Sequence, residues 1–433
     1  MDTPIFLKEQ FEKLQAQETS ELTGFRQQAF QNLEQYGIPT LKHEEWRYTR
    51  VNTLFNKDYE VNNNTGLTWE QLSDNRLPGY QDANELVFVN GVFNPSLSNL
   101  LSADLEVLPL NEAAAVYKNI VDTYLGHSAD YLKDGINALS SAFVHGGVFI
   151  QVKRSKAVEH PVYIYNVAVA TDVNVLAQPR SLVYLQQNAQ LTITETNITL
   201  GSQQSFTNKV MEIVLEQDAN LSYYLIQNDS TNASQVSTTH IRHIGTSYSK
   251  AVTVSLDGAL VRNNLNIILE APHCESHMYG LSLLSGTTHV DNHTIVDNRQ
   301  PDCLSNELYK GLFDGNSTGV FNGKIFVQQI AQKTNAFQSN KNILLSDGAS
   351  VNTKPQLEIF ADNVKCSHGC TIGQLDEEAL FYLQSRGITE NSAKAMLLHG
   401  FAIDVLDNIT NEAIKKYVDV IISKRLNFDL ETI

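Results

Sequence analysis

The pattern of apolar and polar positions changes along the chain. Up to about residue 60, apolar residues recur at intervals of three and four, as amphipathic helices require. Gly37 and Pro39 end the main helical run in the usual C-terminal order. Residues 61–135 are mixed, with a strand-like run at ELVFVNGVF and a helix-like run at NEAAAVYKNIVDTYL. We therefore predict an N-terminal helical region over residues 1–60 and a mixed α/β connecting region over residues 61–135.

Residues 136–373 have the sequence pattern of an all-β domain. Their apolar runs are short, β-branched and alternating, and Gly, Asn, Asp and Ser separate them. Typical runs are VHGGVFIQV, PVYIYNVAV and VMEIVLEQDANLSYYLI. Helical runs are absent from about 140 to 366, so we predict a domain built mainly of β-strands.

Two matched turns indicate a repeat inside this domain. VYLQQNAQLTI superposes on IVLEQDANLSY with Ala189 over Ala219, a shift of 30 residues. The Asp-Gly-Ala turns at 257–259 and 347–349 recur at a shift of 90, three times that interval. Coils of 20–30 residues that stack strand on strand bury their core as a β-helix. The repeat favours a parallel β-helix, and a β-sandwich is the alternative that gives similar alternation.

The last region, residues 374–433, returns to helical periodicity. Asp376 is a good N-cap ahead of EEALFYLQSRG, and Gly387 closes that helix. Thr389 then starts ENSAKAMLLHGFAIDVL, and NEAIKKYVDVIISKRL follows. The apolar side chains of this region either pack on the β domain or form a docking surface for another protein. They are Leu380, Phe381, Leu383, Met396, Leu397 and Phe401.

Composition narrows the class of protein. The 433 residues are 42% hydrophobic and 18% charged, as in globular proteins, and the formal charge of −17 argues against a general nucleic-acid binder. The N-terminus MDTPIFLKEQFEKLQ has no apolar signal core, and no apolar run approaches the length of a membrane span. Four cysteines in so long a chain do not make a disulfide framework. We expect a cytoplasmic protein with reduced cysteines and no membrane partner.

The common enzyme motifs are missing. The segment DGNSTGVFNGKI contains Gly323 and Lys324, but Ile325 follows where a Walker A loop needs Ser or Thr. The chain has no GxGxxG after a strand and no GxSxG nucleophile elbow. The sequence therefore offers no nucleotide cradle and no hydrolase nucleophile.

Four histidines crowd into about twenty residues at His273, His277, His289 and His293. In a β region, His289 and His293 would share one face of a strand, where they could ligate a metal. The alternative is that they hydrogen-bond the backbone at turns of the β domain. Cys303 is predicted to be a small buried residue.

A second cluster lies in ADNVKCSHGCTIGQLDEEALFYLQSRG, where Cys366, His368 and Cys370 have i, i+2, i+4 spacing. On a β-strand this spacing points all three side chains to one face. Thiolate and imidazole suit iron, zinc or copper, and Lys365 favours the thiolate form. A zinc or iron site needs four ligands, so the others would come from elsewhere or from a second subunit. The alternative is two buried thiols beside a hydrogen-bonded histidine.

Residues from about 290 to 390 resemble the SufB/SufD family of the SUF iron–sulfur cluster assembly machinery. The resemblance is carried by VDNHTIVDNRQPDCLSNELYKGLFDGNSTGVFNGKIFV, by AQKTNAFQSNKNILLSDGASVNTKPQLEIFADN and by the Cys-His-Cys segment quoted above. GIPTLKHEEWRYT at 37–49 is similar to the SufD branch in particular. The SufB pattern has a cluster-building cysteine within the stretch matching TNAFQSNKNILL, and Asn340 stands there in this chain.

The resemblance implies a right-handed parallel β-helix flanked by N- and C-terminal helical regions. It also implies a non-catalytic scaffold that pairs with a SufB-like subunit and docks a SufC-like ABC ATPase, which explains the missing Walker motif. An iron–sulfur cluster would be present only transiently, in complex with the partner, and none would be tightly bound to the isolated chain. The β-helix end could also pair two copies of this chain.

The resemblance assigns roles to particular residues. Cys366 and His368 match the family's Cys-Ser-His positions, and His368 would ligate iron at the shared interface. Cys370 stands where a small residue is commoner, so we expect it to be a buried strand thiol. The residues expected to dock the ATPase are Leu380, Phe381, Met396 and Phe401.

Two other classes of protein fit parts of the pattern. A β-helix enzyme acting on polysaccharide would share the repeat, although the missing signal peptide and the flanking helical regions argue against it. A self-contained metal-binding β-helix would use the four histidines between 273 and 293, and it would hold metal without partners.

Overall fold

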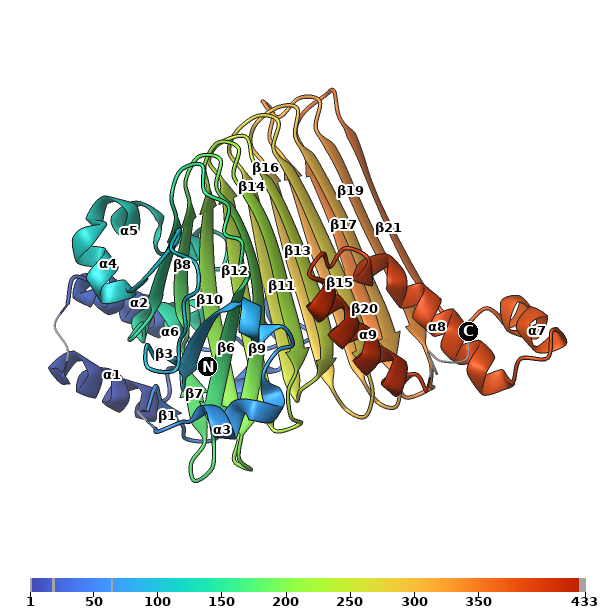
Figure 1. The fold of residues 1–433 in the computed structure, drawn as a ribbon, viewed down its shortest axis with the longest axis horizontal. Coiled ribbons are helices and arrows are strands. Elements are labelled where there is room, and N and C mark those ends of the chain that lie inside the picture. The colour runs from blue at the N-terminus through green and yellow to red at the C-terminus, as the bar shows by residue number, and fades with distance from the viewer. Residues whose placement is uncertain (1, 18–19, 64, 428–433) are drawn as a thin grey trace.

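The computed structural model of the chain describes residues 2–17, 20–63 and 65–427. Two long sheets face each other, and successive strands along the β domain alternate between them (Figure 1). Within each sheet, almost every neighbouring pair is parallel and separated by one coil of the chain. The prediction of a parallel β-helix is therefore confirmed, and the β-sandwich alternative is wrong because its sheets would pair antiparallel strands.

We name the two sheets A and B. Along sheet A lie β4 (Leu105–Pro109), β5 (Val148–Val152), β8 (Arg180–Leu185), β10 (Ser205–Leu215), β12 (Ala233–His243), β14 (Leu260–Leu269), β16 (His289–Asn298), β18 (Thr318–Val327) and β20 (Ser350–Ile359), with β7 (Val175–Ala177) beside β10 and β1 (Glu60–Val61) beside β7. Along sheet B lie β3 (Val92–Phe93), β2 (Asn84–Val89), β6 (Val162–Val169), β9 (Gln190–Leu200), β11 (Asn220–Asn228), β13 (Tyr248–Asp257), β15 (Glu275–Leu284), β17 (Leu304–Phe313), β19 (Asn335–Leu344) and β21 (Lys365–Gly373).

The strand register confirms the repeat. Leu221 of β11 lies opposite Leu191 of β9, an offset of 30 residues. In sheet A, Leu260 pairs with His289, His289 with Thr318, and Thr318 with Ser350. The two Asp-Gly-Ala turns precede the first and last of these residues, so they occupy equivalent positions three coils apart.

Nine α-helices, counted over the described residues, flank the sheets. They are α1 (Ile5–Gln17), α2 (Thr23–Tyr36), α3 (Trp69–Leu72), α4 (Leu110–Val116), α5 (Lys118–Tyr124), α6 (Gly135–Ala142), α7 (Glu377–Ser385), α8 (Glu390–Leu406) and α9 (Glu412–Arg425). Residues 143–376, all of which the structure describes, contain no helix. The N-terminal helical region forms α1 and α2, and β2 and β4 of the connecting region join the sheets. No helix in the described ranges has both the length and the apolar character that a membrane crossing needs.

Alternation of side chains produces three apolar layers. One fills the lumen between the sheets and includes Ile213 and Leu225. The outer face of sheet A is covered by the N-terminal helices, with Leu33 and Phe206 in one cluster. The outer face of sheet B is covered by α8 and α9, for example where Leu398 packs in the same cluster as Leu281. The alternating pattern of the strands and the helical periodicity of the flanking regions therefore act together, and they bury both faces of each sheet.

The C-terminal helices begin where their caps predict. The Asp376 carboxylate accepts hydrogen bonds from the backbone N–H groups of Glu378 and Ala379 at 2.9 and 3.1 Å. The Thr389 hydroxyl accepts from the Ser392 N–H at 3.3 Å. These caps satisfy N–H groups that a helix start leaves without partners, so the two predicted starts are confirmed.

Candidate functional site

The β-helix ends openly at its last coil. β20 is the last strand of sheet A and β21 is the last strand of sheet B (Figure 1). One edge of each strand therefore has backbone N–H and C=O groups that no strand within the described residues pairs. Ile359, Phe360 and Ile372 are exposed at this end, with Phe360 58% exposed. An unpaired double edge with apolar side chains is a natural surface for another protein.

The Cys-His-Cys cluster lies on β21, as its spacing predicts. Cys366 is in register with Ala336 of β19, which is buried in the luminal core, and Cys366 itself packs against that core. Because side chains alternate along a strand, His368 and Cys370 lie on the same luminal side as Cys366. The three side chains therefore line the mouth of the lumen at its open end.

The four cysteines differ in exposure. Cys366 is half-buried, and burial raises the pKa of its thiol. Cys370 is exposed, so the expectation of a buried thiol there is wrong. Its position would be buried in any earlier coil, but no coil follows β21 to cover it. Cys303 is fully buried, which confirms its prediction, and Cys274 is buried beside it in the luminal core.

No group of three or more His, Cys, Asp or Glu side chains within residues 2–17, 20–63 and 65–427 is arranged to hold a metal ion. The three side chains on β21 are thus at most part of a ligand set. The four clustered histidines are divided between two sheets. His273 lies in the turn before β15 and His277 lies on β15, where its Nε2 is 2.6 Å from Glu275 Oε1. His289 and His293 lie on β16, in the opposite sheet.

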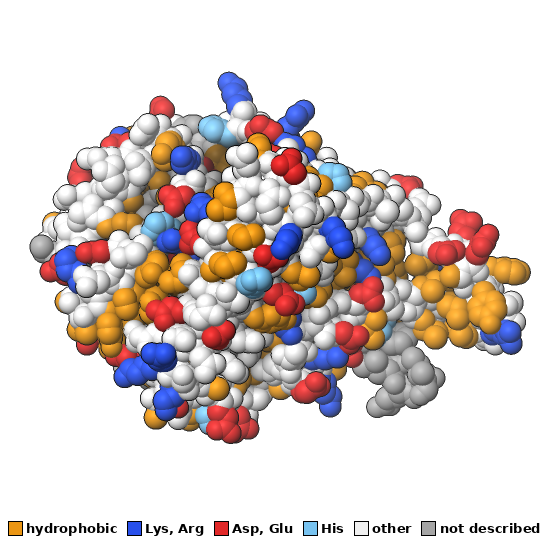
Figure 2. All heavy atoms as spheres, turned by 90° about the horizontal axis from the view of Figure 1, so that it is seen from above, with side chains coloured by type: hydrophobic (Ala, Val, Ile, Leu, Met, Phe, Trp, Pro, Cys, Tyr) orange, Lys and Arg blue, Asp and Glu red, His pale blue; other side chains and the backbone are white. Residues whose placement is uncertain are grey.

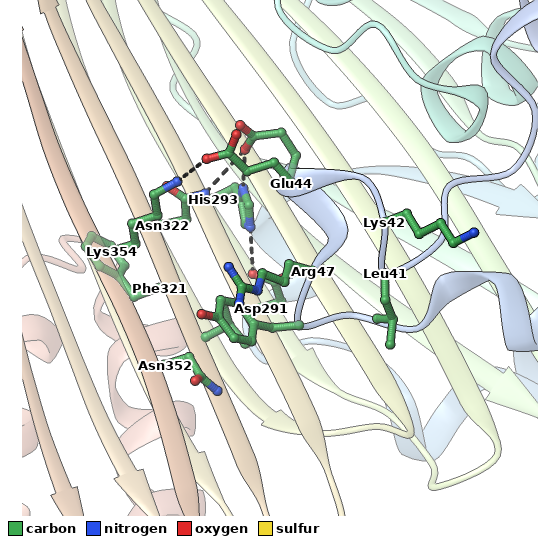
Figure 3. Close-up of a pocket in the computed structure, with 13 residues that line it drawn as sticks. Leu41, Lys42, Glu44, Arg47, Asp291, His293, Phe321, Asn322, Asn352 and Lys354 are labelled. Carbon is green, nitrogen blue, oxygen red and sulfur yellow. Dashed lines mark hydrogen bonds and ion pairs between the residues drawn. The ribbon is translucent and has the colours of Figure 1, made fainter.

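His289 and His293 share a face, as predicted, and that face contacts an N-terminal segment, residues 43–49, which we call the strap. His289 Nε2 lies 2.9 Å from the hydroxyl oxygen of Thr49. His293 Nε2 lies 3.0 Å from Asp291 Oδ1, and its Nδ1 lies 3.5 Å from Glu45 Oε2 (Figure 3). Both histidines therefore already have polar partners in the fold.

The strap crosses successive strands of sheet A towards the open end. Arg262 of β14 donates to the backbone oxygen of Glu45 at 2.5 Å. Lys324 of β18 donates to the Glu45 carboxylate at 2.6 Å. Lys354 of β20 pairs with Glu44 at 2.5 Å (Figure 3). Together with His293 of β16, these contacts tie the strap to four neighbouring coils. The strap thus braces the coils that lead to β20.

A cavity of about 540 Å³ lies between the strap and sheet A (Figure 3). Charges of both signs surround an apolar floor. The lining side chains are Leu41, Lys42, Glu44, Glu45, Arg47, Tyr48, Asp291, His293, Val320, Phe321, Asn322, Asn352 and Lys354.

The Glu45 contacts should stabilise the fold in a pH-dependent manner. Hydrogen bonding to His293, and then to Lys324, lowers the pKa of Glu45 from 4.5 to about 2 against the opposing effect of burial. Because the folded pKa is depressed, the contribution is present above about pH 4.5 and is lost as the pH falls towards about 2. Glu45→Gln should cost about 1 kcal/mol at neutral pH, since the carboxylate is partly exposed and screened.

Urea unfolding of wild-type and Glu45→Gln at several pH values measures this contribution. The difference between their midpoints should shrink steadily from about pH 5 to about pH 3. Glu21→Gln, at an exposed pair 3.9 Å from Lys118, should change stability by less than about 0.5 kcal/mol at neutral pH. A Glu45→Gln difference that stays constant across this pH range would contradict the prediction.

The four residues expected to dock an ATPase differ in their settings. Phe381 of α7 is 72% exposed, and α7 has no buried residue. Leu380 is half-buried and lines a cavity with Leu345. Met396 and Phe401 of α8 are half-buried, and Phe401 packs against sheet B. Figure 2 shows hydrophobic side chains gathered on the projecting lobe that α7 forms.

A buried polar pair behind His368 was not singled out from the sequence. Glu307 of β17 and Gln338 of β19 face the lumen, and Gln338 Nε2 donates to Glu307 Oε2 at 2.7 Å. No motif marks either residue. Extending the 30-residue repeat through β17, β19 and β21 would have aligned both with His368, so the repeat was the signal that could have found them.

Comparisons with known proteins cover nearly the whole chain. Residues 5–164 match the model described as the SufBD protein N-terminal region. Residues 168–401, more than half of the chain, match the model described as SUF system FeS cluster assembly, SufBD core domain. The second match contains all strands from β7 to β21 together with α7, and so includes the open end.

Similar whole proteins come from distant organisms. An iron–sulfur cluster assembly SufBD family protein of Synechocystis is 33% identical, over 90% of this chain and 88% of its own length. The iron–sulfur cluster assembly protein SufD of Escherichia coli is 30% identical, over 92% of each chain. A chloroplastic protein of Arabidopsis thaliana, ABCI7, is 26% identical over 87% of this chain and 80% of its own length. With both domain models and these full-length relatives in agreement, the chain belongs to the SufBD family and is similar to SufD.

Proposed function

We propose that this chain is a non-catalytic scaffold subunit of a cytoplasmic iron–sulfur cluster assembly complex of the SufBCD type. The observation that carries the proposal is the open end of the β-helix, where unpaired strand edges, apolar side chains and the His368 and Cys366 ligand atoms lie together. Unpaired strand edges that carry exposed apolar side chains are typical of surfaces that another protein covers.

The proposed partner at this end is a SufB-like subunit with a β-helix of its own. Its last strands would pair with β20 and β21, so that the two lumens meet end to end. Backbone hydrogen bonds would supply affinity, and Ile359, Phe360 and Ile372 would be buried in the contact. A second copy of this chain could form the same contact in the absence of SufB.

The iron–sulfur cluster is cargo in this proposal. His368 would provide a neutral imidazole to iron at the interface, and Cys366 would provide a thiolate after its burial environment changes. Asn340 is buried in the lumen where the SufB pattern has its cysteine, so the partner would supply the cluster-building thiol. The incomplete ligand set on β21 agrees with a cluster shared between two subunits.

A SufC-like ATPase would dock on α7 and α8, using the four residues considered above. Binding of ATP would draw two ATPase copies together and pull on the helical ends of both scaffold subunits. Since the chain has no nucleotide motif, the energy for opening the interface would come from contacts of ATP with the ATPase. The exposed aromatic surface of α7 supports this docking site.

His368→Ala tests the proposed function. The variant should fold normally, because the side chain is exposed, while cluster yield of the co-expressed complex should fall by at least about tenfold. The measurement is iron and sulfide content after anaerobic purification, with co-purifying subunits identified by mass spectrometry. His273→Asn, at an exposed turn with φ 58°, is the matched histidine control and should keep its yield.

Two results would contradict the proposal. One is a normal cluster yield from His368→Ala. The other is a wild-type chain that purifies alone with stoichiometric metal, which would instead favour a self-contained metalloprotein that uses the clustered histidines.

A further inference from the structure

Three luminal residues stand in one column that ends at the open mouth. Glu307 of β17 is in register with Gln338 of β19, and Gln338 is in register with His368 of β21. Neighbouring strands lie about 4.8 Å apart, so in-register side chains on one face stack directly on each other. His368 is therefore the neighbour of Gln338 on one side of the column, and Glu307 is its neighbour on the other side.

Within this column, Gln338 and Glu307 are joined by a hydrogen bond. Gln338 is 3% exposed and Glu307 is 2% exposed, and the Gln338 amide donates to the Glu307 carboxyl group at 2.7 Å. Burial raises the pKa of Glu307 to about 7, and both its neutral and its ionised forms offer an oxygen to the amide. The contact therefore holds the Gln338 side chain in either state.

The opposite sheet leaves room for this amide. Gly323 of β18 faces it across the lumen, and a Cβ atom at Gly323 would lie 2.2 Å from Gln338 Nε2. Any larger residue at 323 would displace the amide from its present place. Gly323 thus serves the packing of Gln338.

The carbonyl oxygen of the same amide is unused. Oε1 of Gln338 is buried and has no hydrogen-bond partner among the described residues. A buried acceptor without a partner has lost its hydration without compensation, so the site favours any donor that comes within reach. The next side chain in the column is His368, and the imidazole ring carries an N–H donor in its neutral form.

We propose that Gln338, held by Glu307, is a positioning residue for His368: a turn of the imidazole ring towards the lumen would let its N–H donate to Gln338 Oε1 and leave the other ring nitrogen facing the open end with its lone pair free. The inference rests on the proposed function for the role of that lone pair. Histidines that bind metals almost always donate their second nitrogen to a carbonyl or carboxylate, which fixes the tautomer and the ring orientation. Gln338 provides that acceptor from inside the lumen.

The tautomer of His368 is the direct readout, and it is independent of cluster assembly. In the full-length chain labelled with ¹⁵N-histidine, the His368 signals are assigned by their loss in His368→Ala. Wild-type should show one dominant neutral tautomer. Gln338→Met removes the acceptor at similar volume, and should change the tautomer ratio at least twofold and lower cluster yield of the complex by about 10- to 100-fold.

Three further variants separate positioning from general destabilisation. Glu307→Gln keeps an oxygen for the Gln338 amide, and should retain the wild-type tautomer. Gly323→Ala displaces the amide without removing it, and should reproduce the tautomer change if Gln338→Met folds poorly. Gln235→Met removes another buried luminal amide far from β21, and should leave the His368 signals unchanged.

The outcomes are distinguishable. An unchanged His368 tautomer in both Gln338→Met and Gly323→Ala would overturn the positioning role. A changed tautomer together with normal cluster yield in His368→Ala would uphold the contact and reject the proposed function instead.

Discussion

Lys209→Met is expected to lower the free energy of unfolding by about 3–5 kcal/mol, the cost of leaving a buried partner charge alone. Lys209 of β10 is 1% exposed and forms an ion pair with Glu195 of β9 inside the lumen. Glu195 also accepts from the Tyr223 hydroxyl at 2.6 Å and from the Asn166 amide at 2.7 Å. Methionine would remove the cation of this cluster and leave the buried Glu195 carboxylate with its neutral hydrogen-bond donors but without a paired charge.

The same reasoning predicts that the charges can be removed together. Burial lowers the pKa of Lys209 against its attraction to Glu195, because desolvation disfavours the charged ammonium group. The double variant Lys209→Met with Glu195→Leu should therefore recover most of the loss, because neither charge is then buried unpaired.

Urea unfolding at neutral pH, followed by far-ultraviolet circular dichroism, measures these effects. Lys153→Met is the matched control at a 62% exposed side chain, and should change stability by less than about 0.5 kcal/mol. Equal midpoints for Lys209→Met and Lys153→Met would reject the argument. Failure of the double variant to recover stability would show that the pair contributes more than its desolvation costs.

Phe381→Asp is expected to weaken binding of the SufC-like ATPase roughly 30- to 700-fold, the range for loss of an aromatic anchor worth about 2–4 kcal/mol. Phe381 and Tyr382 are 72% and 57% exposed on α7. Because α7 buries no side chain of its own, the substitution should not affect folding. An aspartate at this position would also place a charge in the apolar contact.

Isothermal titration of the purified ATPase into the full-length chain gives the dissociation constant. Val116→Asp, at a 61% exposed apolar position on α4, is the control at the other end of the molecule and should bind like wild-type. Wild-type affinity in Phe381→Asp would show that the ATPase docks elsewhere, and would leave the half-buried Leu380 and Met396 without the proposed role.

The prediction for Phe381 came from sequence, but its neighbours show the limit of that reasoning. Helical periodicity placed six apolar residues on the C-terminal helices and the family resemblance selected four of them, but neither separated those that pack from those that protrude. Phe401 lies against sheet B with the Lys310 ammonium 4.5 Å from its ring, whereas Phe381 projects into solvent. Which face a helix buries depends on its docking angle, and that angle is set by contacts that are distant in the chain.

Local patterns by themselves determined that a β domain lies between helical regions, and they favoured a β-helix over a β-sandwich. Alternation with a 30-residue interval predicted stacked coils, and capping residues such as Asp376 and Thr389 marked the helix starts. Both signals act between neighbours in sequence or between equivalent positions of successive coils, so they can be read without coordinates. The i, i+2, i+4 spacing on β21 likewise placed His368 and Cys366 on one face.

Only the tertiary structure decided what covers those faces. It showed that β21 is the last strand, so Cys370 is exposed although its pattern matches that of a buried thiol. It divided the clustered histidines between two sheets, and it brought the strap at Glu45 to Lys324, 279 residues away along the chain. It also stacked Glu307 and Gln338 beneath His368. Burial and charge pairing depend on contacts between residues that are far apart in the sequence. These contacts form only when the chain folds, so local patterns do not reveal them.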